Sequence, residues 1–188
     1  MGTHSFGAEN GQKDEPDIGD EWRAKIVRFF SKLDADKDGI VDRRDYVDKT
    51  VERARRYFGA DKINDFNDTI SEAWLSFWSV SEDEYRGSLD EKDAIWIHKR
   101  LFKVNKLDES NRDWAEGLFR AADGDDNEEL SVYEHKAFCR VFNVQEGFDK
   151  SFKCIDGNQN GSIDKEEFLQ AAHDYFYNRK EDSWFFGV

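Results

Sequence analysis

The sequence predicts an all-α fold of four helix–loop–helix units, arranged as two paired lobes in one compact body. Two patterns predict it: apolar residues recur at helical spacing, and aspartate-rich segments of twelve residues separate the helical stretches. With 38% hydrophobic and 15% aromatic residues, the 188-residue chain can also fill a core. We expect a flexible polar tail over residues 1–19, a first lobe over residues 20–103 and a second lobe over residues 104–188.

Helical periodicity places each helix in turn, the first beginning at Asp20. A short polar link over residues 103–111 then joins the lobes, and its length favours a compact body over two separated lobes. The apolar positions that define the helices are Trp22, Ile26, Phe29, Phe30 and Leu33; Tyr46, Val51 and Ala54; Ile63, Phe66, Ile70, Trp74, Phe77 and Trp78; Ile95, Trp96, Leu101 and Phe102; Trp114, Leu118 and Phe119; Phe138, Val141, Phe142, Phe148, Phe152 and Ile155; Phe168, Ala172 and Phe176.

The first loop, residues 34–45, reads DADKDGIVDRRD and has carboxylates at alternate positions, with Gly39 where the chain must turn sharply. This spacing matches the twelve-residue EF-hand loop, which offers six to eight oxygens to calcium. Its last residue is aspartate, one methylene shorter than the usual glutamate, which favours six-coordinate magnesium. We therefore predict a mixed calcium/magnesium site. Its ligands are Asp34, Asp36, Asp38, the Ile40 carbonyl and Asp45.

The second loop, residues 82–93, is degenerate when Gly87 and Leu89 are placed in its sixth and eighth positions. Arg86 then stands at a ligand position, and a guanidinium has no lone pair to donate to a cation. We expect this loop to bind no ion and to pair structurally with the first loop.

The third loop, residues 123–134, reads DGDDNEELSVYE and departs from the pattern at one position, where Glu128 replaces glycine. A positive φ costs such a residue about 1 kcal/mol, which several carboxylates around one ion can outweigh. We predict a bound calcium ion. Its ligands are Asp123, Asp125, Asn127, the Glu129 carbonyl and Glu134.

The fourth loop, residues 156–167, reads DGNQNGSIDKEE and matches every position of the pattern. Gly161 supplies the positive φ, and we expect the Ile163 side chain to enter the core while its backbone forms a short two-stranded bridge with the neighbouring loop. Asp164 acts through a water molecule. The direct ligands are Asp156, Asn158, Asn160, the Ser162 carbonyl and Glu167.

Composition narrows the partners to cations. A net charge of −14 makes nucleic acid and anionic membranes poor partners, and no segment approaches 18 consecutive apolar residues. We expect a cytoplasmic monomer, free thiols at Cys139 and Cys154, and an aromatic end at Trp184, Phe185 and Phe186 that docks onto the body.

These features, with loops one, three and four intact, resemble the sarcoplasmic calcium-binding proteins of invertebrates over residues 20–188. Calerythrin, calexcitin, luciferin-binding proteins and photoproteins share this four-hand body. The resemblance implies a calcium/magnesium buffer with three bound ions and no catalytic activity. In that family an aspartate commonly closes the first loop, as Asp45 does here.

Two other functions stay open. A calcium sensor would bind a target protein through a methionine-rich groove, but the only methionine is Met1, which favours a buffer. A luciferin-binding protein or photoprotein would use the aromatic interior; His173 and Tyr177 lie four residues apart, as in such a site. However, the first helix has no histidine and the chain ends in Gly187 and Val188, without the C-terminal proline that closes a photoprotein cavity.

Overall fold

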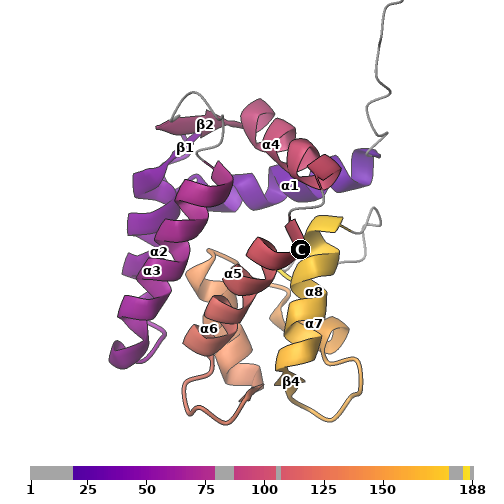
Figure 1. Ribbon diagram of the computed structural model, residues 1–188. Coiled ribbons are helices and arrows are strands. Elements are labelled where there is room, and N and C mark those ends of the chain that lie inside the picture. The colour runs from indigo at the N-terminus through magenta and orange to yellow at the C-terminus, as the bar shows by residue number, and fades with distance from the viewer. Residues whose placement is uncertain (1–18, 79–86, 105–106, 178–183, 187–188) are drawn as a thin grey trace, which may run out of the picture.

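The computed structural model describes residues 19–78, 87–104, 107–177 and 184–186. It confirms the all-α class, with helices in two lobes and two short antiparallel sheets (Figure 1). In chain order the elements are α1 (Asp20–Leu33), β1 (Ile40–Asp42), a π-helical turn (Arg44–Asp48), α2 (Lys49–Ala54), a 3-10 turn (Ala60–Lys62), α3 (Ile63–Ala73), a second π-helical turn (Trp74–Trp78), β2 (Ser88–Asp90), α4 (Glu91–Val104), α5 (Leu107–Ala122), β3 (Glu129–Leu130), α6 (Val132–Val141), α7 (Phe148–Ile155), β4 (Ile163–Asp164) and α8 (Lys165–Tyr177).

The two sheets join the loops in pairs. Strand β1 pairs with β2 so that Val41 lies opposite Leu89, and β3 pairs with β4 so that Leu130 lies opposite Ile163. All four residues stand at the eighth position of their loops and are buried. The register therefore confirms both the predicted bridges and the alignment of the second loop, which had only Gly87 and Leu89 to support it.

The helix boundaries agree with the periodicity at the start of the chain but not between the lobes. Helix α1 begins at Asp20 and buries its predicted apolar face. The predicted link over residues 103–111 is wrong, because α4 continues to Val104 and α5 begins at Leu107. The segment contains neither glycine nor proline, and residues such as lysine, leucine and glutamate propagate a helix readily.

The two lobes pack directly on each other. Helix α3 packs against α5, where a Cβ on Gly117 would lie only 2.4 Å from Thr69 Oγ1. The side chain of Arg53 donates from Nε to the Val141 carbonyl over 2.6 Å, which ties α2 to α6. Near the start of α1, Trp22 Nε1 donates to the Phe176 carbonyl of α8 over 2.7 Å. These contacts make one body of the two lobes, as expected.

The aromatic end of the chain lies inside this body. Phe185 and Phe186 are fully buried, which confirms the predicted docking. The Phe186 ring lies 4.6 Å from the Phe29 ring and 5.1 Å from the Phe142 ring, between centroids, so it contacts both lobes. Ser151 Oγ donates to the Trp184 carbonyl over 2.7 Å and anchors the segment to α7.

Two further expectations concern the cysteines and membrane-spanning helices. Cys139 and Cys154 are both free, the first buried and the second exposed. Among the described residues, no helix combines the length and apolar character needed to span a membrane.

Candidate metal centres

The first, third and fourth loops share one backbone shape. In each, the residues at the fourth and sixth positions have positive φ. At the fourth position these are Lys37 (61°), Asp126 (57°) and Gln159 (58°), and at the sixth Gly39 (86°), Glu128 (66°) and Gly161 (91°). The strain predicted for Glu128 is therefore real. Because three different sequences adopt the same shape, the spacing of the loop rather than any single residue determines it.

The same shape fixes the first ligand of each loop. The backbone N–H at the sixth position donates to Oδ2 of the first aspartate, over 3.0 Å in loops one and three and 3.1 Å in loop four. This bond holds one carboxylate oxygen and turns the first aspartate toward the middle of its loop. The three aspartates in question are Asp34, Asp123 and Asp156.

In the first loop, oxygens of Asp34, Asp36 and Asp38 lie within 4.8 Å of one another. Asp34 Oδ1 is buried and has no hydrogen-bond donor in the described part of the chain. A buried carboxylate oxygen without a donor is costly unless a cation balances it. The residues present therefore fit a hard divalent cation that prefers oxygen ligands.

Asp45, the predicted closing ligand of that loop, does not belong to this group of three. Its Oδ2 accepts from the Asp42 backbone N–H over 3.3 Å, and its own N–H donates to Asp42 Oδ1 over 3.0 Å. Burial raises the pKa of Asp45, and the carboxylates of Asp42 and Asp36 raise that pKa further. The closing carboxylate thus stays at the exit of the loop, where a cation would have to draw it in.

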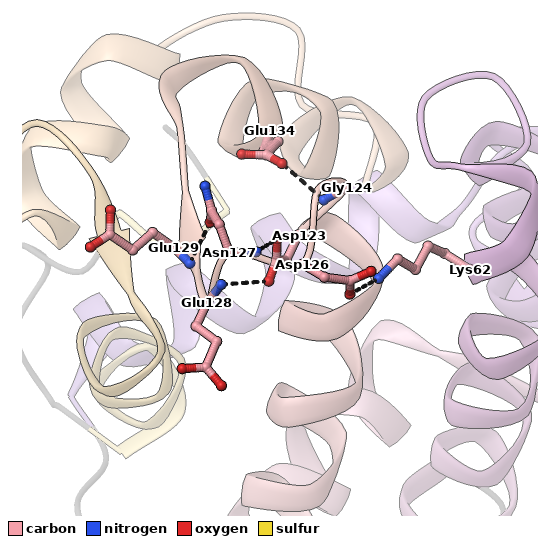
Figure 2. Close-up of polar contacts among 8 residues, drawn as sticks. All are labelled: Lys62, Asp123, Gly124, Asp126, Asn127, Glu128, Glu129 and Glu134. Carbon is pink, nitrogen blue, oxygen red and sulfur yellow. Dashed lines mark hydrogen bonds and ion pairs between the residues drawn. The ribbon is translucent and has the colours of Figure 1, made fainter.

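The third loop closes differently. Oxygens of Asp123, Asp125 and Glu134 lie within 4.8 Å of one another. Glu134 Oε1 accepts from the Gly124 backbone N–H over 2.8 Å, and Oε2 accepts from the Ser131 backbone N–H over 2.9 Å. Figure 2 shows the Glu134 side chain reaching back to Gly124 at the loop entrance. One carboxylate therefore bridges the two ends of the loop.

The remaining predicted ligands of the third loop follow the same hydrogen-bond ladder. The Asn127 backbone N–H donates to Asp123 Oδ1 over 3.2 Å, and Asn127 Oδ1 accepts from the Glu129 N–H over 2.9 Å. Glu129 opens β3, which joins this loop to the fourth (Figure 1). Asn127 is thus held by the backbone, and its position as a ligand remains a prediction.

The fourth loop has the same closure with fewer carboxylates. Glu167 Oε1 accepts from the Asn158 N–H over 3.1 Å, and Oε2 accepts from the Asp164 N–H over 3.1 Å. Asn160 Oδ1 accepts from the Ser162 N–H over 2.9 Å. Relative to the first loop, the amides of Asn158 and Asn160 replace two carboxylates, so the attraction for a cation depends more on Asp156 and Glu167.

The second loop keeps only part of this arrangement. Asp90 and Asp93, at its ninth and twelfth positions, exchange the hydrogen bonds that link Asp42 to Asp45 in the first loop. Since all four loops have this exchange, it marks the start of the exiting helix and does not diagnose a metal site. Arg86 and the rest of residues 82–86 lie outside the described residues, so the predicted absence of an ion stays a prediction.

The family model described as "EF hand" matches residues 26–47 and 148–171, which contain the first and fourth loops. By this match the chain carries calcium-binding EF hands at its first and fourth loops. The third loop lies outside the matched segments, although its backbone shape and closing glutamate equal those of the fourth. No curated protein matches the sequence.

Solved structures share the fold across nearly the whole chain. Calcium-loaded apo-aequorin from Aequorea victoria is 19% identical, with a TM-score of 0.70 over 85% of this chain and 92% of aequorin. The calcium-loaded coelenterazine-binding protein from Renilla muelleri is 19% identical, with a TM-score of 0.62 over 90% and 98%. A calcium-binding protein from Streptomyces coelicolor is 18% identical, with a TM-score of 0.69 over 82% and 97%. At 18–19% identity, these similarities establish a shared fold and nothing about function.

One residue beside the third loop was missed by the sequence analysis. Lys62, which ends the 3-10 turn before α3 in the first lobe, forms an ion pair with Asp126 Oδ1 in the third loop (Figure 2). Sixty-four positions separate the two residues, and only the packing of α3 against α5 brings them together.

Proposed function

We propose that the protein is a cytoplasmic calcium/magnesium buffer that binds three divalent ions, in loops one, three and four. The observation that supports buffering most strongly is the position of Phe186. Its ring is fully buried between Phe29 of the first lobe and Phe142 of the second. A sensor must expose an apolar groove to a target helix, and here the chain itself covers those faces.

The geometry of the loops supports the proposal of three ions. Each proposed loop turns its first aspartate inward through the sixth-position N–H, and loops three and four also close through a glutamate that reaches the loop entrance. The first loop has four predicted carboxylate ligands, but the shorter Asp45 closes it. Fewer oxygens in a tighter cage favour magnesium's octahedral geometry, so we assign magnesium at rest to this loop first.

Calorimetric titration with calcium in about 1 mM magnesium tests the buffer directly. We expect three sites with affinities near the ~10⁻⁸ M of calcium/magnesium buffers, weakened by magnesium. An environment-sensitive apolar dye added to the same samples should show no calcium-dependent increase in emission. Affinities near ~10⁻⁶ M that ignore magnesium, together with a calcium-dependent dye signal, would instead identify a sensor.

Binding of an aromatic ligand such as coelenterazine is the second candidate, favoured by one local observation. The rings of His173 and Tyr177 on α8 stack, with centroids 4.4 Å apart. The ion-dependent proteins of similar fold include aequorin and a coelenterazine-binding protein. Against this, Phe186 already occupies the interior beside Tyr175, 5.1 Å away between ring centroids.

Tryptophan emission separates this candidate from the buffer. The chain has six tryptophans, and Trp22, Trp74 and Trp114 are buried. Coelenterazine in the interior would quench them in a saturable way. We expect no saturable quenching in the wild-type protein. Quenching that saturates near equimolar coelenterazine, and that is lost in His173→Ala, would establish the ligand function.

A further inference from the structure

Lys62 places a positive charge from the first lobe against a metal loop of the second lobe. Its side chain is only 14% exposed, whereas that of its partner Asp126 is 75% exposed. The lysine side chain extends from the first lobe to the third loop, where it meets Asp126 (Figure 2). The hydrogen bond to Asp126 raises the pKa of Lys62, so the ammonium is charged at neutral pH.

Asp126 stands at the fourth position of the third loop, which supplies no ligand in this motif. Lys62 consequently does not compete for a coordinating oxygen. It acts through its charge on a loop with six acidic residues. These are Asp123, Asp125, Asp126, Glu128, Glu129 and Glu134. Asp123, the first predicted ligand, also contributes to the field that favours the charged lysine.

We propose that Lys62 sets the cation affinity of the third loop, lowering it by offsetting part of the loop's negative charge. The inference rests on the proposed function, in which this loop binds a divalent ion. A fixed unit charge near a dication repels it by an amount that falls with distance and with salt. Loop four also closes through a glutamate, so it serves as the comparison site for the third loop.

A second consequence concerns the two lobes. Because the ammonium belongs to the first lobe and the loop to the second, the affinity of the third loop depends on how α3 packs against α5. By linkage, an ion entering the third loop weakens this interlobe contact by the same factor. Through this ion pair, the first lobe influences ion binding at the third loop.

The test compares wild type with Lys62→Met in the full-length protein. The sixth-position amides of Gly39, Glu128 and Gly161 each donate to the first aspartate of their own loop, so each reports on one site in proton–nitrogen spectra. Calcium is added against a chelator, without magnesium, in about 20 mM salt. We expect Lys62→Met to tighten the third loop about fivefold and the fourth less than twofold.

Two control variants and a salt series complete the design. Lys62→Arg keeps the charge and should bind as wild type does. Lys92→Met removes one positive charge from the exposed start of α4, next to β2, and should leave the third loop unchanged. Figure 1 shows β2 at the opposite end of the molecule from β4, the partner strand of β3. In about 0.5 M salt, where the Debye length is a few ångströms, the gain in Lys62→Met should fall below about twofold.

The outcomes separate the inference from the proposed function. If the Glu128 amide does not respond to calcium in wild type, the third loop binds no ion and the proposed function fails there. If it responds equally in wild type and in Lys62→Met, or if Lys62→Met binds more weakly, only the inference is overturned. An equal gain in Lys92→Met would also overturn it, because the effect would then be one of net charge.

Discussion

The first and third loops have the same backbone shape and different closures. Both turn Gly39 or Glu128 to positive φ and both direct that residue's N–H at the first aspartate. In the third loop, however, Glu134 reaches from the twelfth position to the Gly124 N–H at the entrance, while Asp45 in the first loop exchanges hydrogen bonds with the nearby Asp42. One methylene group separates these two arrangements.

The backbone shape of the loop and the closure of its ligand cage therefore depend on different residues. Backbone shape follows from the aspartate at position one and from the turn at position six. Closure requires a side chain long enough to cross the loop, as Glu134 and Glu167 are. In the first loop the Asp45 carboxylate is bonded to Asp42, whereas in loops three and four the closing glutamate lies at the loop entrance.

Removing the closing carboxylate should have the largest effect. Glu134→Gln replaces the predicted bidentate carboxylate with an amide, and we expect the calcium affinity of the third loop to fall on the order of 100-fold. Glu167→Gln should do the same in the fourth loop. The number of calcium ions bound at about 0.1 µM free calcium, held by a chelator without magnesium, should drop from three to two in either variant, because a site near ~10⁻⁸ M stays filled there and one near ~10⁻⁶ M does not.

Glu166→Gln is the matched control for Glu167→Gln, since it removes a neighbouring charge that is not a ligand. It should retain three ions. A variant at Glu134 that still binds three ions at this calcium concentration would show that the third loop does not close through that residue.

Lengthening the short closure should have an intermediate effect. Asp45→Glu gives the first loop the reach that Glu134 has, so a second carboxylate oxygen becomes available to a larger ion. We expect the ratio of calcium to magnesium affinity at this loop to rise about tenfold. Competition titrations with both ions, followed at the Gly39 amide, measure that ratio. The reverse change, Glu167→Asp, should lower the same ratio in the fourth loop; unchanged ratios in both variants would disprove the role of side-chain length.

The sixth position should give a smaller effect, on stability rather than on selectivity. Gly161→Ala introduces a Cβ that meets no atom within 4 Å, so its cost is conformational and about 1 kcal/mol. Glu128→Gly removes the strain of a non-glycine residue at positive φ in the third loop. Because glycine also loses more entropy on folding, the net stabilisation of the calcium-free protein should be only about 0.5 kcal/mol. Urea unfolding in chelator measures both changes, and equal signs in the two variants would contradict the comparison.

Much of this architecture was predictable because it depends on local spacing. Ile163 was placed at a bridge from its eighth position alone, and the strand register confirms it. Glycine or a strained residue at position six is equally a local requirement. The predicted link over residues 103–111 was wrong for the opposite reason. These residues are polar but include neither glycine nor proline, so the local pattern does not mark where one helix ends and the next begins.

What the sequence could not show is contact between distant segments. Lys62 has no motif around it, and its position beside Asp126 follows from the fit of Gly117 on α5 against Thr69 on α3. The reach of Asp45 was similarly beyond a pattern search. The pattern indicates that its side chain is shorter, but only the structure shows that its carboxylate bonds to Asp42.

The acidity of Asp45 gives the smallest predicted effect and the sharpest contrast between closures. Burial, with Asp42 and Asp36 adding to it, raises the pKa of Asp45 in the folded protein above its unfolded value. Between those two values the folded state holds more protons, so this residue's contribution to stability falls as pH rises. In chelator, Asp45→Asn should therefore gain stability over wild type as pH rises above 3.8, the ordinary aspartate value, and through the raised pKa of Asp45.

The calcium affinity of the first loop should have the opposite pH dependence to that stability contribution, because it should fall as the pH is lowered. Because the raised pKa of Asp45 favours its protonated form, acidification sets a proton in competition with the ion at this carboxylate and should weaken the first loop. The Gly39 amide measures this weakening in titrations at pH 7 and near pH 5, and Asp45→Asn, which has no proton to lose there, should reduce it. If Asp45→Asn left the pH dependence of the first loop unchanged, the closing carboxylate would not take part in binding, and the contrast between the two loops would rest on Asp34, Asp36 and Asp38 alone.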